Sequence, residues 1–189
     1  LNGWHYFGGG MELYRELYED FNLRPYPAGN SGCQMGGWFK KEINSVDDLQ
    51  GLKMRIPGFG GEVLRRNGGT PVAMPGAEIF TALQTGTLDA AEWIGPYNDL
   101  TFGFHKVAKH YYYPGWHEGG PTLECIVNKE AYESLPKDLQ TIVDIAASAT
   151  NDSMLAEFMA RNAFALEQIE QMDDIKISPF PKDVMDAFK

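Results

Sequence analysis

The feature that most constrains this chain is a long run, from Lys137 to about Met172, that contains neither glycine nor proline. Pro136 stands directly before it, and proline is well tolerated in the first turn of a helix. At about 1.5 Å per residue, a helix over 136–172 would be on the order of 50 Å long, which exceeds the width of a small lobe. The run therefore predicts a helix that bridges two lobes, although a kinked or broken helix would give the same pattern.

The composition limits the classes of partner. The chain has 189 residues, and its 16 Lys plus Arg against 26 Asp plus Glu give a formal net charge of −10, with the basic residues scattered. A nucleic acid partner is therefore not expected. Hydrophobic residues make up an ordinary 43%, and no apolar run approaches the roughly 20 residues of a membrane span. These values predict a globular chain of one domain or two small lobes.

The two cysteines and the first residue carry little information about function. Cys33 and Cys125 lie far apart, with no partner at zinc-ligand spacing. We expect both to be buried thiols, and a disulfide between them is left open. The chain begins at Leu1 without the pattern of a signal peptide, so either its start has been removed or it is a fragment.

Helical and extended patterns alternate through the first half of the chain. Over residues 11–21 apolar and aromatic side chains recur at intervals of three and four, which predicts an amphipathic helix. Strands are predicted over 52–56, 70–73 and 88–92, with helices over 60–67 and 77–84 between them. Such alternation is typical of an α/β architecture with a substantially parallel sheet. Two more strands are predicted over 107–113 and 122–127.

Several common catalytic and nucleotide-binding motifs are absent. There is no GxxxxGK[ST] phosphate loop, no GxSxG and no HExxH, and PGFGGEVL lacks the third glycine of a dinucleotide fingerprint. The four histidines, His5, His105, His110 and His117, show no metal or triad spacing. We expect them at surface or core positions.

A few polar residues stand out because they follow predicted strands or lie in glycine-rich turns. Arg55 ends the strand LKMRI, where open α/β sheets bind ligands, and its guanidinium could hold a carboxylate with two hydrogen bonds. Glu92 and its neighbour Trp93 follow another strand, while Gln34 lies in GCQMGGW and Glu118 in GWHEGG. Each residue alone could also have a purely structural role, such as a surface ion pair or a half-buried tryptophan. Together, oxygen ligands beside a guanidinium predict a hard cation next to an organic anion.

Four segments carry a specific resemblance: GNSGCQMGGW, GLKMRIPGFGGEV, DAAEWIGPYND and YYYPGWHEGGP, in that order. In these segments, and over essentially its whole length, the chain resembles the periplasmic solute-binding proteins of TRAP transporters, in particular the branch that binds 2-oxo and 2-hydroxy monocarboxylates. The resemblance implies a receptor and not an enzyme. Its implied fold is α/β and two-lobed, periplasmic binding protein type II-like, with a long lobe-spanning helix and with the N-terminal lobe largely missing from this chain.

The resemblance also implies roles for the candidate residues. Arg55 would pair with the carboxylate of a small organic acid, pyruvate-like or lactate-like. A sodium or calcium ion would bridge the acid and the protein. The ligands of that ion would be side-chain oxygens of Gln34, Glu92 and Glu118 and the main-chain oxygen of Trp93. Gln34 would also contact the acid, and the pocket wall would include Trp93, Phe59 and Trp116.

Partners and location follow from the same resemblance. The receptor would be exported to the periplasm, where it would deliver its acid to the membrane subunits of a TRAP transporter; a homodimer is left open. In the implied lobe arrangement, residues 1–89 belong mostly to the second lobe. Residues 90–125 supply strands of the first lobe and the hinge, and residues 126–189 return to the second lobe.

Two alternatives remain open at the level of the sequence. Glu92 and Glu118 could be the general acid and base of a hydrolase, since glycosidases use paired carboxylates. In that case Arg55 and Gln34 would have no obvious function. Alternatively, the chain could be a fragment that has lost ligand binding.

Overall fold

The computed structural model describes all residues from 1 to 189, and these divide into two compact units. Unit 1 contains residues 1–32 and 120–159, and unit 2 contains residues 33–119 and 160–189. The chain passes between the units after Gly32, Gly119 and Met159. These points differ from the boundaries predicted at 89/90 and 125/126, because residues 90–119 pair into the same sheet as the residues before them. The lobe of a complete receptor to which each segment belongs stays a prediction.

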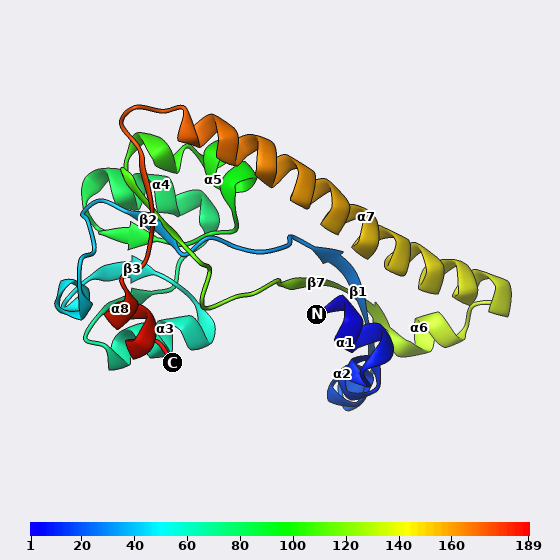
Figure 1. Cartoon of the computed structure of the whole chain (residues 1–189). Helices are drawn as coiled ribbons and strands as arrows, with labels where there is room; N and C mark the ends of the chain where they lie inside the picture. The colour runs from blue at the N-terminus through cyan, green and yellow to red at the C-terminus, as the bar shows by residue number, and fades with distance from the viewer. The chain divides into compact units, whose positions relative to one another are not determined.

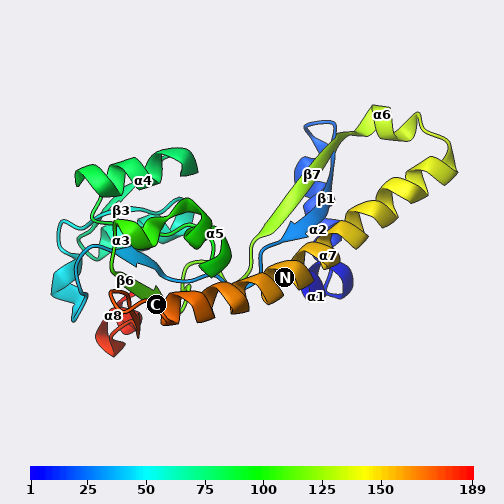
Figure 2. The same ribbon diagram turned by 90° about the horizontal axis from the view of Figure 1, so that it is seen from above.

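Unit 1 is built on a two-stranded antiparallel ribbon. Strand β1 (Leu23–Asn30) pairs with β7 (Thr122–Asn128) (Figure 2). The register shifts between Pro27 and Gly29. Three short helices belong to the same unit: α1 (Asn2–Phe7), α2 (Gly10–Glu19) and α6 (Lys129–Glu133). Helix α2 confirms the helix predicted over 11–21, and β7 confirms the strand predicted over 122–127.

One helix, α7 (Lys137–Glu170), contributes residues to both units, up to Met159 in unit 1 and from Ala160 in unit 2. It runs without interruption (Figure 1), so the kinked or broken alternative is wrong. Its bounds agree with the predicted 136–172 within the usual uncertainty of helix ends. No helix of the chain, α7 included, combines the length and the apolar character that crossing a membrane requires.

Unit 2 contains a six-stranded sheet in the order β4-β3-β5-β2-β6-β8. Its strands are β2 (Gly37–Phe39), β3 (Lys53–Arg55), β4 (Thr70–Val72), β5 (Ala90–Ala91), β6 (His110–Tyr113) and β8 (Lys176–Pro179). Strand β3 runs parallel to β4 and β5, and β6 runs parallel to β8. Strand β2 is antiparallel to both of its neighbours, β5 and β6. The sheet is therefore parallel on either side of β2, as predicted, and mixed because of β2.

Side chains on the central strands alternate between the two faces of this sheet. Trp38 and Tyr111 lie in one buried apolar cluster, whereas their neighbours Phe39 and Tyr112 lie in another. The first cluster is closed by helices α4 (Gly76–Thr85) and α5 (Pro96–Phe102), and the second by α3 (Gly58–Arg66) and α8 (Lys182–Ala187) (Figure 1). Helices α3 and α4 confirm those predicted over 60–67 and 77–84. Both faces of the sheet are thus covered by helices, as in α/β folds generally.

Two local expectations are corrected by the structure. Cys33 and Cys125 are exposed free thiols and not buried ones. Cys125 lies on β7, most of whose residues are exposed because a ribbon of only two strands covers little of its own surface. The strand predicted over 107–113 begins only at His110, because residues 104–106 form a 3-10 turn before it.

Candidate functional site

The ends of two neighbouring parallel strands in unit 2 bring Arg55 and Glu92 together. Arg55 is the last residue of β3 and pairs in register with Ala91, the last residue of β5. The main-chain nitrogen of Glu92 donates a hydrogen bond to the main-chain oxygen of Arg55 at 3.1 Å. Parallel strands end at the same edge of a sheet, which is where open α/β sheets place their ligands. The two residues therefore meet at that edge, as their positions after predicted strands suggest.

The guanidinium of Arg55 is held by the segment that follows β5. Its Nη1 donates to the main-chain oxygen of Glu92 at 3.0 Å and forms an ion pair with Oε1 of the Glu92 carboxylate. Its Nε donates to the main-chain oxygen of Met74 at 3.4 Å, and its Cζ lies 5.0 Å from the centre of the Trp93 ring. The Arg55 side chain is only 11% exposed. Its positive charge is therefore fixed beside Glu92 and Trp93.

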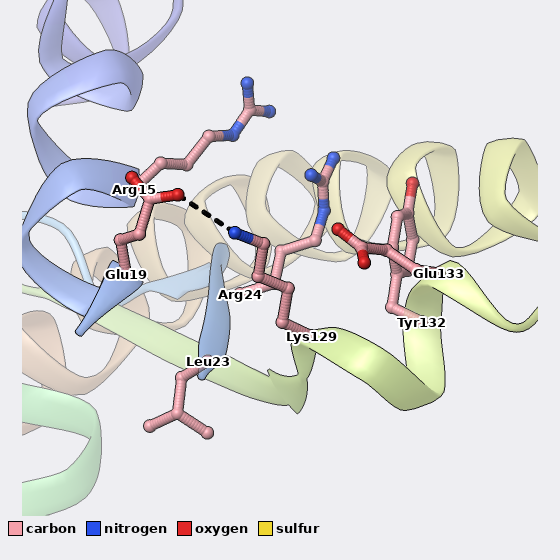
Figure 3. Close-up of a pocket in the computed structure, with 7 residues that line it drawn as sticks. All are labelled: Arg15, Glu19, Leu23, Arg24, Lys129, Tyr132 and Glu133. Atoms are coloured by element: carbon pink, nitrogen blue, oxygen red, sulfur yellow. Dashed lines mark hydrogen bonds and ion pairs between the residues drawn. The ribbon is translucent and has the colours of Figure 1, made fainter. Parts of the chain in front are cut away.

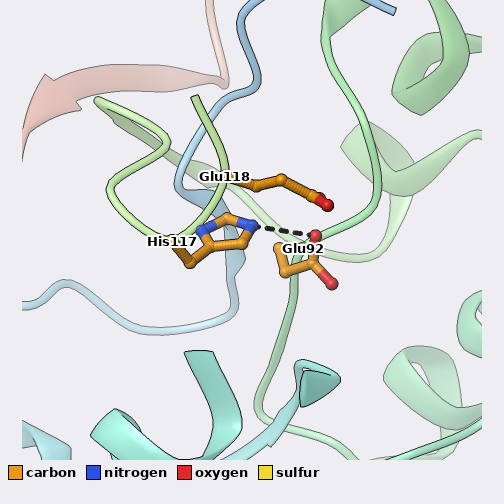
Figure 4. A group of neighbouring side chains, drawn as sticks. All are labelled: Glu92, His117 and Glu118. Carbon is orange, nitrogen blue, oxygen red and sulfur yellow. Dashed lines mark hydrogen bonds and ion pairs between the residues drawn. The ribbon is translucent and has the colours of Figure 1, made fainter. Parts of the chain in front are cut away.

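An imidazole and a second carboxylate lie next to the buried carboxylate of Glu92 (Figure 4). Glu92 is 1% exposed, and its Oε2 lies 3.1 Å from Nε2 of His117. A carboxylate only accepts hydrogen bonds, so we assign the proton of this bond to Nε2. An oxygen of Glu118 completes a group of three ligand atoms that all lie within 4.8 Å of one another. The structure thus brings Glu92 and Glu118 together, and His117, on the loop of Glu118, contacts Glu92.

Gln34 belongs to a loop that packs against the loop of Glu118. Its main-chain oxygen accepts a hydrogen bond from the main-chain nitrogen of Gly115 at 3.1 Å. A Cβ atom at position 115 would lie 2.5 Å from that oxygen, so only glycine lets the two loops approach this closely. Gln34 is 7% exposed, and its Oε1 is buried without a hydrogen-bond partner. Such an oxygen is available as a ligand, and hard cations prefer ligands of this kind.

The three predicted wall residues have different surroundings. Trp93 lies against Arg55 and packs on the backbone at Gly76, where a Cβ atom would come 2.5 Å from its ring. Trp116 stacks on Phe188 with ring centres 4.1 Å apart and packs against one of the apolar clusters. Phe59, on the first turn of α3, is 93% exposed. Trp93 is thus at the strand-end site, and pocket roles for Trp116 and Phe59 stay predictions.

Two residues near the site were not singled out by the sequence patterns. One is His117, which was expected at an ordinary surface or core position. The other is Asp99 on α5, whose carboxylate accepts hydrogen bonds from Trp38 Nε1 at 3.1 Å, the Tyr111 hydroxyl at 2.7 Å and the main-chain nitrogen of Ile94 at 3.2 Å. Burial raises the pKa of Asp99 to about 7, although these hydrogen bonds act in the opposite direction. The bond to Ile94 fixes the backbone directly after Trp93.

A cavity of about 210 Å³ lies in unit 1 and shares no residue with this site (Figure 3). Its lining contains both charges: Arg15, Glu19, Leu23, Arg24, Lys129, Tyr132 and Glu133. Lys129 pairs with Glu19 at 2.9 Å, and the Arg24 guanidinium lies 4.3 Å from the centre of the Tyr132 ring. Because Lys129 and Arg24 already have partners, the cavity offers less to a ligand than the strand ends of unit 2.

One family of known proteins matches this chain over nearly all of its residues. The family model of DctP, bacterial extracellular solute-binding protein, family 7, matches residues 4–189. The monocarboxylate 2-oxoacid-binding periplasmic protein of Nostoc sp. (strain PCC 7120) is 48% identical over 184 residues, which cover 97% of this chain and 50% of that protein. The chain therefore spans about half the length of this curated relative.

Two solved structures of TRAP periplasmic solute-binding proteins are similar in fold. The protein from Colwellia psychrerythraea, with bound calcium and pyruvate, has a TM-score of 0.95 at 49% identity. The protein from Pseudoalteromonas atlantica, with bound sodium and pyruvate, has a TM-score of 0.93 at 48% identity. Each comparison covers 99% of this chain and 57% of the other. With this α/β fold and a family match over nearly all of its residues, the chain belongs to the bacterial extracellular solute-binding proteins of family 7.

Proposed function

We propose that this chain is part of a TRAP-transporter receptor that captures a small 2-oxo or 2-hydroxy carboxylate together with a sodium or calcium ion. The observation that carries the proposal is the meeting of Arg55 and Glu92 at one edge of the sheet. The cargo class is supported by the relatives, of which one is named for monocarboxylate 2-oxoacids and two were solved with pyruvate. The receptor binds and releases its cargo without changing it chemically.

Arg55 is the group proposed to hold the carboxylate of the acid. Its guanidinium presents paired N–H donors that match the two oxygens of a carboxylate. The neighbouring Trp93 ring and the low exposure of Arg55 keep water away from this pairing, which strengthens it. A lysine at this position would supply the charge but not the planar two-pronged geometry.

The atoms proposed to hold the cation are all oxygens, which sodium and calcium prefer. They are the side-chain oxygens of Gln34, Glu92 and Glu118 and the main-chain oxygen of Trp93. The unpartnered Oε1 of Gln34 supports this set, because a buried polar atom without a partner costs about 1–3 kcal/mol. When bound, the cation supplies the positive charge that lets an anion approach two carboxylates, and a contact for the 2-oxo or 2-hydroxy oxygen. His117 offers a nitrogen, which suits transition metals better, and we assign it to holding Glu92.

The hydrolase alternative explains fewer of these contacts. A hydrolase would use Glu92 and Glu118 as acid and base, but it would have no use for the guanidinium bound to Glu92 or for the unpartnered Gln34 oxygen. The family supports a receptor as well, since its description is that of solute-binding proteins. Export to the periplasm and delivery to TRAP membrane subunits follow from that family, and a homodimer stays a prediction.

Calorimetric titration of the chain with pyruvate tests the proposal. The protein is first stripped with chelator in sodium-free buffer, and the titration is repeated after calcium or sodium is added. We expect measurable binding only with a cation present, and its loss in Arg55→Ala. Arg66→Ala is the matched control, because Arg66 lies on α3 with a 77% exposed side chain.

The outcomes separate the three hypotheses. If Arg55→Ala bound pyruvate as tightly as the unchanged chain, the role of Arg55 would be refuted. Turnover of glycosides that disappears in Glu118→Gln would support the hydrolase. A folded chain that binds none of a panel of 2-oxo and 2-hydroxy acids, with either cation, would support a fragment that does not bind.

A further inference from the structure

Arg55 and Glu92 are bound to each other in this structure, although the proposed function needs each for a different ligand. Nη1 of Arg55 contacts both the carboxylate and the main-chain oxygen of Glu92. The two side chains are 11% and 2% exposed, so water does not compete strongly for either charge. In this arrangement the group that should bind the acid is neutralised by the group that should bind the cation.

The Glu92 carboxylate has a donor on each of its oxygens. Oε1 accepts from Arg55, and Oε2 accepts from Nε2 of His117 at 3.1 Å. A buried charge that loses its partner is strongly destabilised, so Glu92 gives up Arg55 only to another positive group. The same holds for Arg55, which gives up Glu92 only to another anion. Glu118 has no contact with Arg55 among the ion pairs of the structure, although it lies within the same group of ligand atoms.

We infer that Arg55 changes partner when the site fills: Glu92 holds it in the empty site and releases it to the acid only once a cation sits against Glu92. This inference rests on the proposed function and concerns the order of events at that site. It makes the empty receptor unreceptive to a bare carboxylate, because the acid would have to displace Glu92 from Arg55 unaided. Cation and acid then bind with positive coupling, and each raises the affinity for the other by the same factor.

A comparison of two variants tests the partner change. Glu92→Gln and Glu118→Gln each replace one negatively charged carboxylate by a neutral amide, which is a weaker cation ligand, but only Glu92→Gln removes the ion pair of Arg55. Binding of radiolabelled pyruvate is measured by equilibrium dialysis in sodium-free buffer with chelator, and again with calcium. Circular dichroism verifies that each variant is folded.

Without cation, we expect Glu92→Gln to bind pyruvate at least tenfold tighter than Glu118→Gln and than the unchanged chain. With calcium, the unchanged chain should bind pyruvate. In both variants, the addition of calcium should raise the affinity for pyruvate only slightly. Equal affinities of the two variants without cation would overturn the partner change while leaving the receptor function standing. Absence of binding by the unchanged chain with any acid and cation would instead overturn the proposed function, and the partner change with it.

If Glu92→Gln is not folded, Arg55→Gln gives the second measurement. This variant removes the guanidinium that competes with the cation for Glu92. Its affinity for calcium in the absence of acid should therefore be at least tenfold higher than that of the unchanged chain. An unchanged calcium affinity would overturn the inference, because Arg55 would then not compete for Glu92.

Discussion

Gly115→Ala is the substitution that most directly tests how the Gln34 loop is positioned. A Cβ atom at residue 115 would lie 2.5 Å from the main-chain oxygen of Gln34 and 2.7 Å from its carbonyl carbon. Both distances fall well below the roughly 3.5–4.0 Å of ordinary non-bonded contacts. The obstacle is backbone, which cannot turn away as a long side chain does. The two loops must therefore separate, and the hydrogen bond from Gly115 to Gln34 must lengthen.

The expected cost is that of overpacking, about 1–3 kcal/mol of the free energy of unfolding. For a chain of this size, each kcal/mol lowers the melting temperature by about 2–4 °C. We therefore expect Gly115→Ala to melt roughly 2–12 °C lower than the unchanged chain. The same movement displaces the Gln34 oxygen from its position as a cation ligand, so calcium affinity should fall about tenfold.

Tryptophan fluorescence during thermal and urea unfolding measures the effect. Three of the four tryptophans, Trp38, Trp93 and Trp116, belong to unit 2, so the signal reports mainly on the unit that contains Gly115. The matched control is Gly119→Ala in the same loop, where a Cβ atom would meet nothing within 4 Å. That control should change the free energy of unfolding by less than about 0.5 kcal/mol. If the two variants were equally stable, the argument from close approach would be refuted.

Further predictions concern a buried acid and two aromatic residues. Because burial raises the pKa of Asp99 from 3.8 to about 7, its proton stabilises the folded state fully below pH 4, and this contribution is lost as pH rises to about 7. Urea unfolding should therefore show stability falling across that window, with a flatter profile in Asp99→Asn; equal slopes would contradict the assignment. Trp116→Ala should cost about 3 kcal/mol in the same assay, because the ring stacks on Phe188. Phe59→Ser should leave stability unchanged, since the side chain is 93% exposed, and a loss of pyruvate affinity in this variant would support its predicted pocket role.

The elements between residues 52 and 92 could be predicted because their signals are local. Each strand there is a short apolar stretch, and each helix ends near glycine, so neighbouring residues alone separate them. The sequence of β1 does not predict a strand, for the opposite reason. It contains Pro25 and Pro27, which normally argue against a strand. In a two-stranded ribbon one side of each strand is open, so these prolines need not break a ladder.

The contacts within the site were less predictable than the positions of its residues. Arg55 and Glu92 follow strands, and strand ends are visible in the sequence. That they form an ion pair depends on the register of β3 with β5, which no local pattern encodes. The sequence around His117 gives no signal of its role, because that role comes from contact with Glu92, a residue on a different loop. Asp99 offered a weak signal, as an acid in the first turn of a helix that begins after Gly95.

The charges at the strand ends explain why one site would take two ligands of opposite sign. The carboxylates of Glu92 and Glu118 outnumber the guanidinium of Arg55, so the empty site has an excess of one negative charge. A monocarboxylate that entered alone would double this excess beside the shielded side chains of Arg55 and Glu92, which is costly. Entry with sodium leaves the excess unchanged, and entry with calcium cancels it. If the ligand oxygens hold both ions equally well, pyruvate should therefore bind more tightly with calcium than with sodium, and Glu118→Gln should reduce or reverse that preference.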